Sequence, residues 1–140
     1  MDEFENIKAL LVIVQPGMEG GNAVPIILSG KVNPSGKLAD TWAYEYEDYP
    51  NSEKFSHNNG NVQTELYEEG IYVGYRYFDT AGVPVNYPFG YGLSYTTFEY
   101  ENLQVKPDGV TFTIRNNGKY DGAEIAQLYV GLPGAKVFVR

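Results

Sequence analysis

The sequence contains no cysteine, which excludes disulfide bonds and thiolate metal sites. Because the sequence has no cysteines, it does not indicate whether the protein's compartment is oxidising or reducing, so cytoplasmic and secreted locations both stay open. Histidine is scarce too, because His57 is the only one in the chain and stands in a polar segment. We therefore expect a solvent-exposed His57, no metal site, no cofactor and no Ser-His-Asp catalytic set.

Positive charge and long hydrophobic runs are also lacking. Lys and Arg number 10 against 18 Asp and Glu, which gives a formal net charge of −8 at pH 7. No basic cluster is present, so nucleic acid is not expected as a partner. No apolar run approaches the roughly 20 residues that span a bilayer, so no membrane partner is expected either. The first five residues are acidic, unlike the basic start of a signal peptide.

Glycine and tyrosine, by contrast, are abundant, with 16 and 13 residues in a chain of 140. This composition favours a chain with many turns and strands. A hydrophobic share of 43% is enough for a globular core. The length allows one ordinary domain or two small pieces.

The first third of the chain has the pattern of a strand followed by a helix. Residues 9–14 are continuously apolar with a β-branched bias, which predicts a strand buried on both faces, as in a parallel sheet. A short helix is predicted over residues 23–28, with Asn22 as N-cap and Pro25 in the first turn. Gly30 is a natural stop for that helix. Together these elements indicate one unit of an α/β layer.

The middle of the chain is polar at first and then aromatic. Residues 43–65 are rich in Asn, Glu and Tyr and are expected to form a long surface loop. Over residues 66–100, Tyr or Phe recurs every two to four positions with Gly between them. This spacing predicts a strand over residues 71–78 with bulky side chains on both faces.

The last third alternates apolar and polar residues, which predicts antiparallel strands. One expected strand places three apolar side chains on a single face: Val110, Phe112 and Ile114. A turn is predicted over residues 116–118, followed by another strand over residues 123–130. A β-sandwich normally needs about seven strands, and only about three fit here.

Several ordered motifs closely resemble family 3 glycoside hydrolases, the β-glucosidase and β-xylosidase group. The matching stretches are residues 15–23, 32–38, 67–79, 87–98, 116–118 and 122–130. The resemblance implies an α/β fragment over residues 1–65 and an aromatic connector over 66–97. The start of a fibronectin type III-like, all-β sandwich would follow over 98–140. The parent enzyme would hydrolyse terminal β-linked sugars, such as β-D-glucosyl residues, with retention.

The catalytic groups that the resemblance implies are missing from this chain. Retaining glycosidases use two carboxyl groups about 5–5.5 Å apart. The family carries its nucleophile in a Ser-Asp-Trp-like motif of a barrel domain and its acid/base in a Gly-Glu-Gly-Tyr-like motif, and neither motif occurs here. Glu68 and Glu69 are adjacent and would face opposite ways on a strand. We therefore assign no catalytic residue.

Two residues are candidates for sugar binding and five for structural roles. Trp42 and Tyr44 have rings that suit partly wet sugar sites, although packing at a domain interface is the favoured interpretation for Trp42. Arg76 is expected to pair with Asp79 or to stack on a neighbouring ring. The remaining structural candidates are Glu19, as an acceptor of N–H groups at the helix start, and Gly90 and Gly92, between large rings.

Three functions follow from these observations. The first is a structural scaffold within a glycosidase, whose partners are the rest of the parent enzyme, including its barrel, and the parent's carbohydrate substrate. The second is an accessory carbohydrate-binding module. The third is a self-associating unit, because both sheets would be cut open and exposed strand edges pair with other chains.

Overall fold

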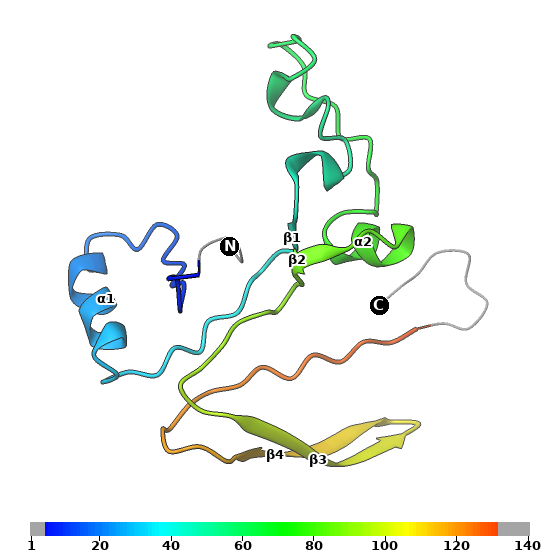
Figure 1. The fold of residues 1–140 in the computed structure, drawn as a ribbon. Coiled ribbons are helices and arrows are strands. Elements are labelled where there is room, and N and C mark those ends of the chain that lie inside the picture. Colours follow the sequence, from blue (N-terminus) through cyan, green and yellow to red (C-terminus); the bar gives the residue numbers. More distant parts are fainter. Residues whose placement is uncertain (1–4, 132–140) are drawn as a thin grey trace. The chain divides into compact units, whose positions relative to one another are not determined.

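The computed structural model describes residues 5–131, and Figure 1 shows its ribbon. The chain forms two compact units, each built from two separate stretches of sequence. The first unit takes Met1–Pro34 and Ser94–Gly122, and the second takes Ser35–Leu93 and Ala123–Arg140. The domain boundaries expected at 65/66 and 97/98 stay predictions, and residues 1–4 and 132–140 of those domains lie outside the described part.

The described helices and strands are short. In chain order they are α1 (Gly20–Leu28), β1 (Trp42–Ala43), η1 (Tyr46–Asp48), η2 (Phe55–His57), α2 (Tyr75–Ala81), β2 (Val85–Tyr87), β3 (Phe98–Lys106) and β4 (Gly109–Asn116). The strands pair as two separate antiparallel sheets, β1 with β2 and β3 with β4. Within residues 5–131, no helix has both the length and the apolar character required to cross a membrane.

The buried strand predicted over residues 9–14 is wrong for this chain. Residues 7–17 belong to no helix or strand, and Leu10 and Val12 are 56% and 44% exposed. A parallel strand exists only when neighbouring strands accept and donate its backbone hydrogen bonds. In the described part of the chain, the paired strands are β1–β4, and none of them pairs with this segment.

Helix α1 exists, but it begins earlier than predicted. It starts at Gly20, with Glu19 rather than Asn22 as its N-cap. Pro25 therefore lies inside the helix instead of in its first turn, where it removes one backbone donor. The Asn22 side chain donates a hydrogen bond to the Glu19 carboxylate, with 2.7 Å between Nδ2 and Oε2. Gly30 follows the helix, as expected of a stop residue, and its N–H donates to the Ile27 carbonyl.

Strands β3 and β4 form a hairpin whose turn is Pro107 and Asp108. This confirms the alternating strand that was expected over Val110–Ile114. In place of the turn predicted over residues 116–118, Asn116 is the last residue of β4 and the chain bends at residues 118–120. The next expected strand does not form, since residues 123–130 carry no regular structure. A β-bulge interrupts the pairing between Glu101 and Gln104.

The two faces of this hairpin differ sharply in polarity. On one face, Glu99 pairs with Arg115 in the strand register, and the Arg115 guanidinium donates to the Glu101 carboxylate at 3.3 Å. The other face is apolar, and several of its side chains are well exposed: Tyr100 (51%), Val105 (75%), Phe112 (39%) and Ile114 (37%). Antiparallel sheets with such alternation usually pack one face on a core. We call these four side chains the apolar hairpin face.

Asn33 joins the helical and hairpin parts of the first unit. Its Oδ1 accepts hydrogen bonds from the Ser94 hydroxyl and the Tyr95 N–H, both at 2.8 Å, and its Nδ2 donates to the Asp121 carbonyl at 3.0 Å. The Tyr95 hydroxyl also donates to the Ile27 carbonyl at the end of α1. The role of Asn33 as a connector is a finding of the structure.

The strand predicted over residues 71–78 is also wrong, because Tyr75–Ala81 is helix α2. The helix is bounded by Gly74 and Gly82, both with positive φ, and Gly82 occupies the left-handed C-cap position that glycine adopts without strain. The aromatic residues of Tyr75–Ala81 are therefore arranged along a helix and not along a strand. Phe78 lies on the inner face of α2 and is 2% exposed.

Phe78 is the centre of the small core of the second unit. It is the one buried hydrophobic side chain among the described residues. The Tyr49 and Tyr77 rings contact it edge-on, at centroid distances of 5.5 and 5.3 Å. A second aromatic group forms where the Tyr75 ring meets Phe89 at 5.3 Å. Burial among the described residues is thus slight, and in the second unit it is accompanied by these aromatic pairs.

Candidate functional site

An aromatic row lies on the β1–β2 sheet of the second unit. Trp42 pairs with Tyr87 in the strand register, and their ring centroids are 6.1 Å apart in an edge-on arrangement. The Tyr87 ring contacts Tyr91 at 4.9 Å. The indole N–H of Trp42 donates to the exposed Asp40 carboxylate at 3.1 Å. Rings beside a carboxylate suit either sugar binding or packing against another protein surface.

The other sugar-binding candidate, Tyr44, is separate from this row. It is 61% exposed and begins the long loop that follows β1. Tyr49, further along that loop, is structural: its hydroxyl donates to the Thr41 carbonyl and accepts from the Ala43 N–H, both at 3.1 Å. The structure therefore brings Trp42 together with Tyr87 and Tyr91, and not with Tyr44.

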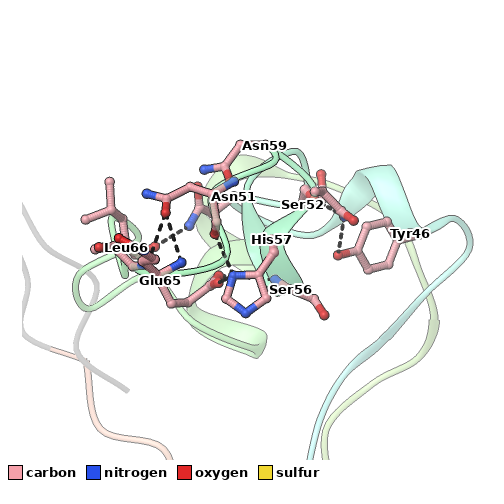
Figure 2. Close-up of polar contacts among 12 residues, drawn as sticks. Tyr46, Asn51, Ser52, Ser56, His57, Asn59, Glu65 and Leu66 are labelled. Carbon is pink, nitrogen blue, oxygen red and sulfur yellow. Dashed lines mark hydrogen bonds and ion pairs between the residues drawn. The ribbon is translucent and has the colours of Figure 1, made fainter.

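The tip of the long loop is a locally closed network, shown in Figure 2. Asn51 Nδ2 donates to the Leu66 carbonyl at 2.8 Å and so joins the two ends of the tip. His57 Nδ1 lies 2.7 Å from the Asn61 carbonyl oxygen and 3.5 Å from the Glu65 carboxylate. The His57 side chain is 44% exposed. No group of three His, Cys, Asp or Glu that could hold a metal ion occurs within residues 5–131.

Glu68 and Glu69 are adjacent but have different surroundings. Glu68 is half exposed and pairs with Lys54. Glu69 lines a hollow of 380 Å³, and its Oε2 is shielded from solvent without a hydrogen-bond partner in the described structure. Sequence reasoning placed the two carboxylates on opposite faces of a strand, but it gave no signal of the hollow.

Three of the structural candidates lie at helices: Glu19 precedes α1, and Arg76 and Asp79 are part of α2. The Glu19 carboxylate accepts a hydrogen bond from the Asn22 side chain and caps no backbone N–H of α1. The Arg76 guanidinium lies over the Tyr75 ring, 5.9 Å from its centroid. Asp79 is exposed on α2 and borders a cavity of 120 Å³ that Phe78 also lines.

Gly90 and Gly92 lie against the segment that precedes β1. Gly90 has a φ of +80°, and its N–H donates to the Leu38 carbonyl at 2.8 Å. A Cβ on Gly92 would lie 2.5 Å from the Gly36 carbonyl oxygen. Lys37, which sequence reasoning missed, donates from Nζ to the Gly92 carbonyl at 2.6 Å and lies 3.3 Å from the Glu124 carboxylate. Only 12% and 16% of these two charged side chains are exposed.

Comparison with known proteins links the chain to a family of carbohydrate-active enzymes. The family model described as Glycosyl hydrolase family 3 C-terminal domain matches residues 1–75 of this chain. Beta-glucosidase A of Butyrivibrio fibrisolvens is 44% identical over 155 residues, which cover 95% of this chain and 18% of that protein. An exo-alpha-(1->6)-L-arabinopyranosidase of Bifidobacterium longum is 42% identical over 135 residues, covering 93% of this chain and 17% of that protein.

Solved structures give the same picture. Beta-glucosidase 3B from Thermotoga neapolitana, in complex with alpha-D-glucose, matches with a TM-score of 0.69 and 49% identity. The match covers 76% of this chain and 16% of that one. A GH3 beta-glucosidase from Bifidobacterium adolescentis matches with a TM-score of 0.71 and 40% identity, over 86% of this chain and 18% of that one. The chain therefore spans about a fifth of the length of the proteins it resembles.

Proposed function

This chain belongs to glycoside hydrolase family 3, and from that premise we propose that it is a non-catalytic, structural part of a retaining β-glycosidase. The parent enzyme hydrolyses terminal β-D-glucosyl or related residues, and its catalytic carboxylates lie outside these 140 residues. Residues 1–65 contribute the end of an α/β sandwich domain, and residues 66–97 form an aromatic connector. Residues 98–140 begin a fibronectin type III-like domain.

The observation that carries this proposal is the mismatch in coverage. The relatives align to more than nine-tenths of this chain, yet the chain accounts for less than a fifth of their length. The sequence also lacks the two carboxylate motifs that the family resemblance implies. A chain with these properties supplies framework to a larger enzyme.

Burial within the chain supports the same reading. Phe78 is the one hydrophobic side chain buried among the described residues, while large hydrophobic side chains such as Leu10, Leu93 and Leu128 are more than half exposed. In a larger enzyme the remaining polypeptide would cover such side chains.

A chimera tests the proposal directly. We expect that the Butyrivibrio fibrisolvens enzyme keeps its β-glucosidase activity when its matching segment, 44% identical, is replaced by this chain. Two controls accompany it: the same enzyme with the segment deleted, and a chimera carrying Gly92→Val. Loss of activity in the chimera despite cooperative folding, or retention in the deletion, would contradict a scaffold role.

Self-association is a second candidate function, and the apolar hairpin face favours it. Covering that face recovers about 25 cal/mol for each Å² of apolar surface removed from water. In the absence of the parent's other segments, a second copy is the available cover. We expect a dimer or larger species, or aggregation, at micromolar concentration.

Sedimentation velocity over a dilution series measures this association. Phe112→Asp should shift the distribution toward monomer, because it places a charge at the centre of the apolar hairpin face. Thr113→Asp is the matched control, since it lies next in β4 but on the polar face. A compact monomer at every concentration would count against self-association.

A further inference from the structure

Two pairs of asparagine followed by glycine occur in the chain. Asn59 and Gly60 lie in the tip of the long loop, and Asn117 and Gly118 directly follow β4. Such a pair loses its side-chain amide when the glycine nitrogen attacks the amide carbon, and glycine hinders this attack least because it has no Cβ. Both asparagines are exposed, so water reaches both. The sequence alone does not distinguish the two pairs, and their surroundings decide which one reacts.

The Asn59 amide has a hydrogen bond that favours attack at its carbon. Its Oδ1 accepts from the Asn61 N–H, with 2.9 Å between the two atoms. Negative charge develops on Oδ1 as a nitrogen attacks Cγ, and a backbone donor that is already in place stabilises this charge. The Nδ2 atom, which leaves as ammonia, donates to no acceptor within residues 5–131. Asn59 belongs to the loop-tip network of Figure 2.

The Asn117 amide is held in the opposite way. Its Nδ2 donates to the Glu99 carboxylate at 2.6 Å, and its N–H donates to the Thr97 carbonyl at 2.9 Å. Its Oδ1 accepts no hydrogen bond from the residues that the structure describes. Gly118 is packed closely too, since a Cβ there would lie 3.0 Å from Thr96 Cα. The leaving group is therefore tied to a carboxylate, and the attacking nitrogen belongs to a restrained main chain.

The two pairs also differ in what must open before the reaction. The Gly60 N–H donates to the His57 carbonyl at 2.8 Å, and this bond breaks before the nitrogen attacks. That contact and the one at Asn59 Oδ1 each join residues at most three positions apart. The partners of Asn117 lie in β3 or just before it, at least 18 positions away. Local contacts in an exposed loop open at a lower free energy than contacts between strands.

We propose that Asn59 is a site of spontaneous deamidation and that the folded hairpin protects Asn117. The Gly60 nitrogen gives its proton to solvent hydroxide and attacks Asn59 Cγ, so that an N–Cγ bond forms. The Cγ–Nδ2 bond breaks, and ammonia leaves with a proton taken from water. Water then opens the cyclic imide at either carbonyl, which leaves aspartate or isoaspartate. The sum of the steps consumes one water and releases one ammonia, with no oxidation or reduction.

The modification changes the charge and the backbone of the loop tip. Either product adds one negative charge to a chain whose formal net charge is −8. In isoaspartate the main chain runs through the former side chain, so the Asn61 N–H loses its side-chain acceptor. The Asn61 carbonyl lies 2.7 Å from His57 Nδ1, so the change reaches the His57 ring. His57 is the only histidine, and its ring signals therefore report on the tip without overlap.

Incubation of the full chain in mildly alkaline buffer, followed by peptide mapping with mass spectrometry, measures the two sites separately. Deamidation adds about one dalton to the peptide concerned. We expect this gain at Asn59 at least about tenfold faster than at Asn117, which corresponds to about 1.4 kcal/mol. A more acidic form on ion exchange and a second set of His57 ring signals in NMR should grow at the Asn59 rate. In guanidinium chloride the two sites should react at similar rates.

Three variants separate the causes. Asn59→Gln should abolish the fast mass gain, because the longer side chain forms the corresponding ring far more slowly, while Asn117→Gln should leave it unchanged. Glu99→Ala should speed the reaction at Asn117 and not at Asn59, because it frees the leaving amide from its carboxylate. Thermal unfolding checks that each variant folds.

Several results would overturn the assignment. They are the absence of a mass gain at Asn59, a rate at Asn117 equal to that at Asn59 in the folded chain, or a ratio of rates that guanidinium chloride leaves unchanged. None of these outcomes depends on β-glucosidase activity, so the inference and the scaffold proposal fail independently.

Discussion

The isolated chain is expected to produce no detectable turnover of an aryl β-glucoside or an aryl β-xyloside. Retention of configuration requires a nucleophile and an acid/base, and neither family motif is present in the sequence. General acid–base catalysis alone typically contributes about 10²–10⁴-fold to the rate. The loss of both groups therefore removes the chemistry, whatever sugar affinity remains. Release of the aryl group, compared with buffer, measures this.

The same assay can also contradict this prediction. Turnover above buffer that disappears in Glu68→Gln or Glu19→Gln would show that a carboxylate of this chain takes part in the reaction. The structure makes such an outcome unexpected at Glu68, which is held by Lys54, and at Glu19, which is held by Asn22. If the chimera is active and the isolated chain is inactive, this chain acts as scaffold and the rest of the enzyme supplies the catalytic groups.

Gly92→Val is expected to destabilise the second unit by about 2–3 kcal/mol, the cost of forcing atoms into a close contact. The new Cβ would lie 2.5 Å from the Gly36 carbonyl oxygen and 3.3 Å from Lys37 Cα, both on the main chain. Relief requires the two segments to separate. That separation weakens the hydrogen bonds between Leu38 and Tyr91 and between Lys37 and the Gly92 carbonyl.

Gly36→Val is the matched control for this substitution. It lies on the opposite side of the same contact, but a Cβ there meets no atom within 4 Å and its φ is not positive. We expect its denaturant midpoint to stay close to that of the unchanged protein. A Gly92→Val midpoint equal to that of Gly36→Val would contradict the close approach.

Residues 71–78 show where sequence reasoning fails. The aromatic residues fit a strand period and a helical period about equally well over so short a stretch, and the β propensity of tyrosine favoured the strand. The deciding residues were Gly74 and Gly82, which bound a seven-residue helix. Their spacing was visible in the sequence, but the helix that they bound packs its Phe78 against Tyr49, which is 29 positions away.

The hairpin formed by β3 and β4 shows where sequence reasoning succeeds. Alternation of apolar and polar residues over Val110–Ile114 predicted a strand, and the structure has one. Period-two patterning is a local property, and antiparallel pairing across a two-residue turn needs no distant partner. The segment over residues 9–14 is equally regular in sequence, yet it is no strand, because a parallel strand needs neighbours that come from elsewhere.

The candidate sites also divide into features that local sequence predicts and features that depend on distant contacts. The rings of Trp42 and Tyr44 marked both residues as sugar-binding candidates, and that role stays a prediction for each. Only the fold shows that Trp42 stands in a row with Tyr87 and Tyr91 while Tyr44 does not. The hollow at Glu69 had no signal at all, because its lining comes from the loop at Pro50 and from residues 69–81 together.

The sequence by itself determined the family, the absence of the family's catalytic motifs and the amphipathic hairpin. Each of these depends on residue identity or on spacing along a few neighbouring positions. The tertiary structure alone decided that Asn33 joins three segments, that Gly92 lies against a carbonyl oxygen, and that Glu69 Oε2 is shielded from solvent without a hydrogen-bond partner. These features depend on contacts between residues far apart in the chain, whose distances are set by the packing of whole segments and not by local propensity.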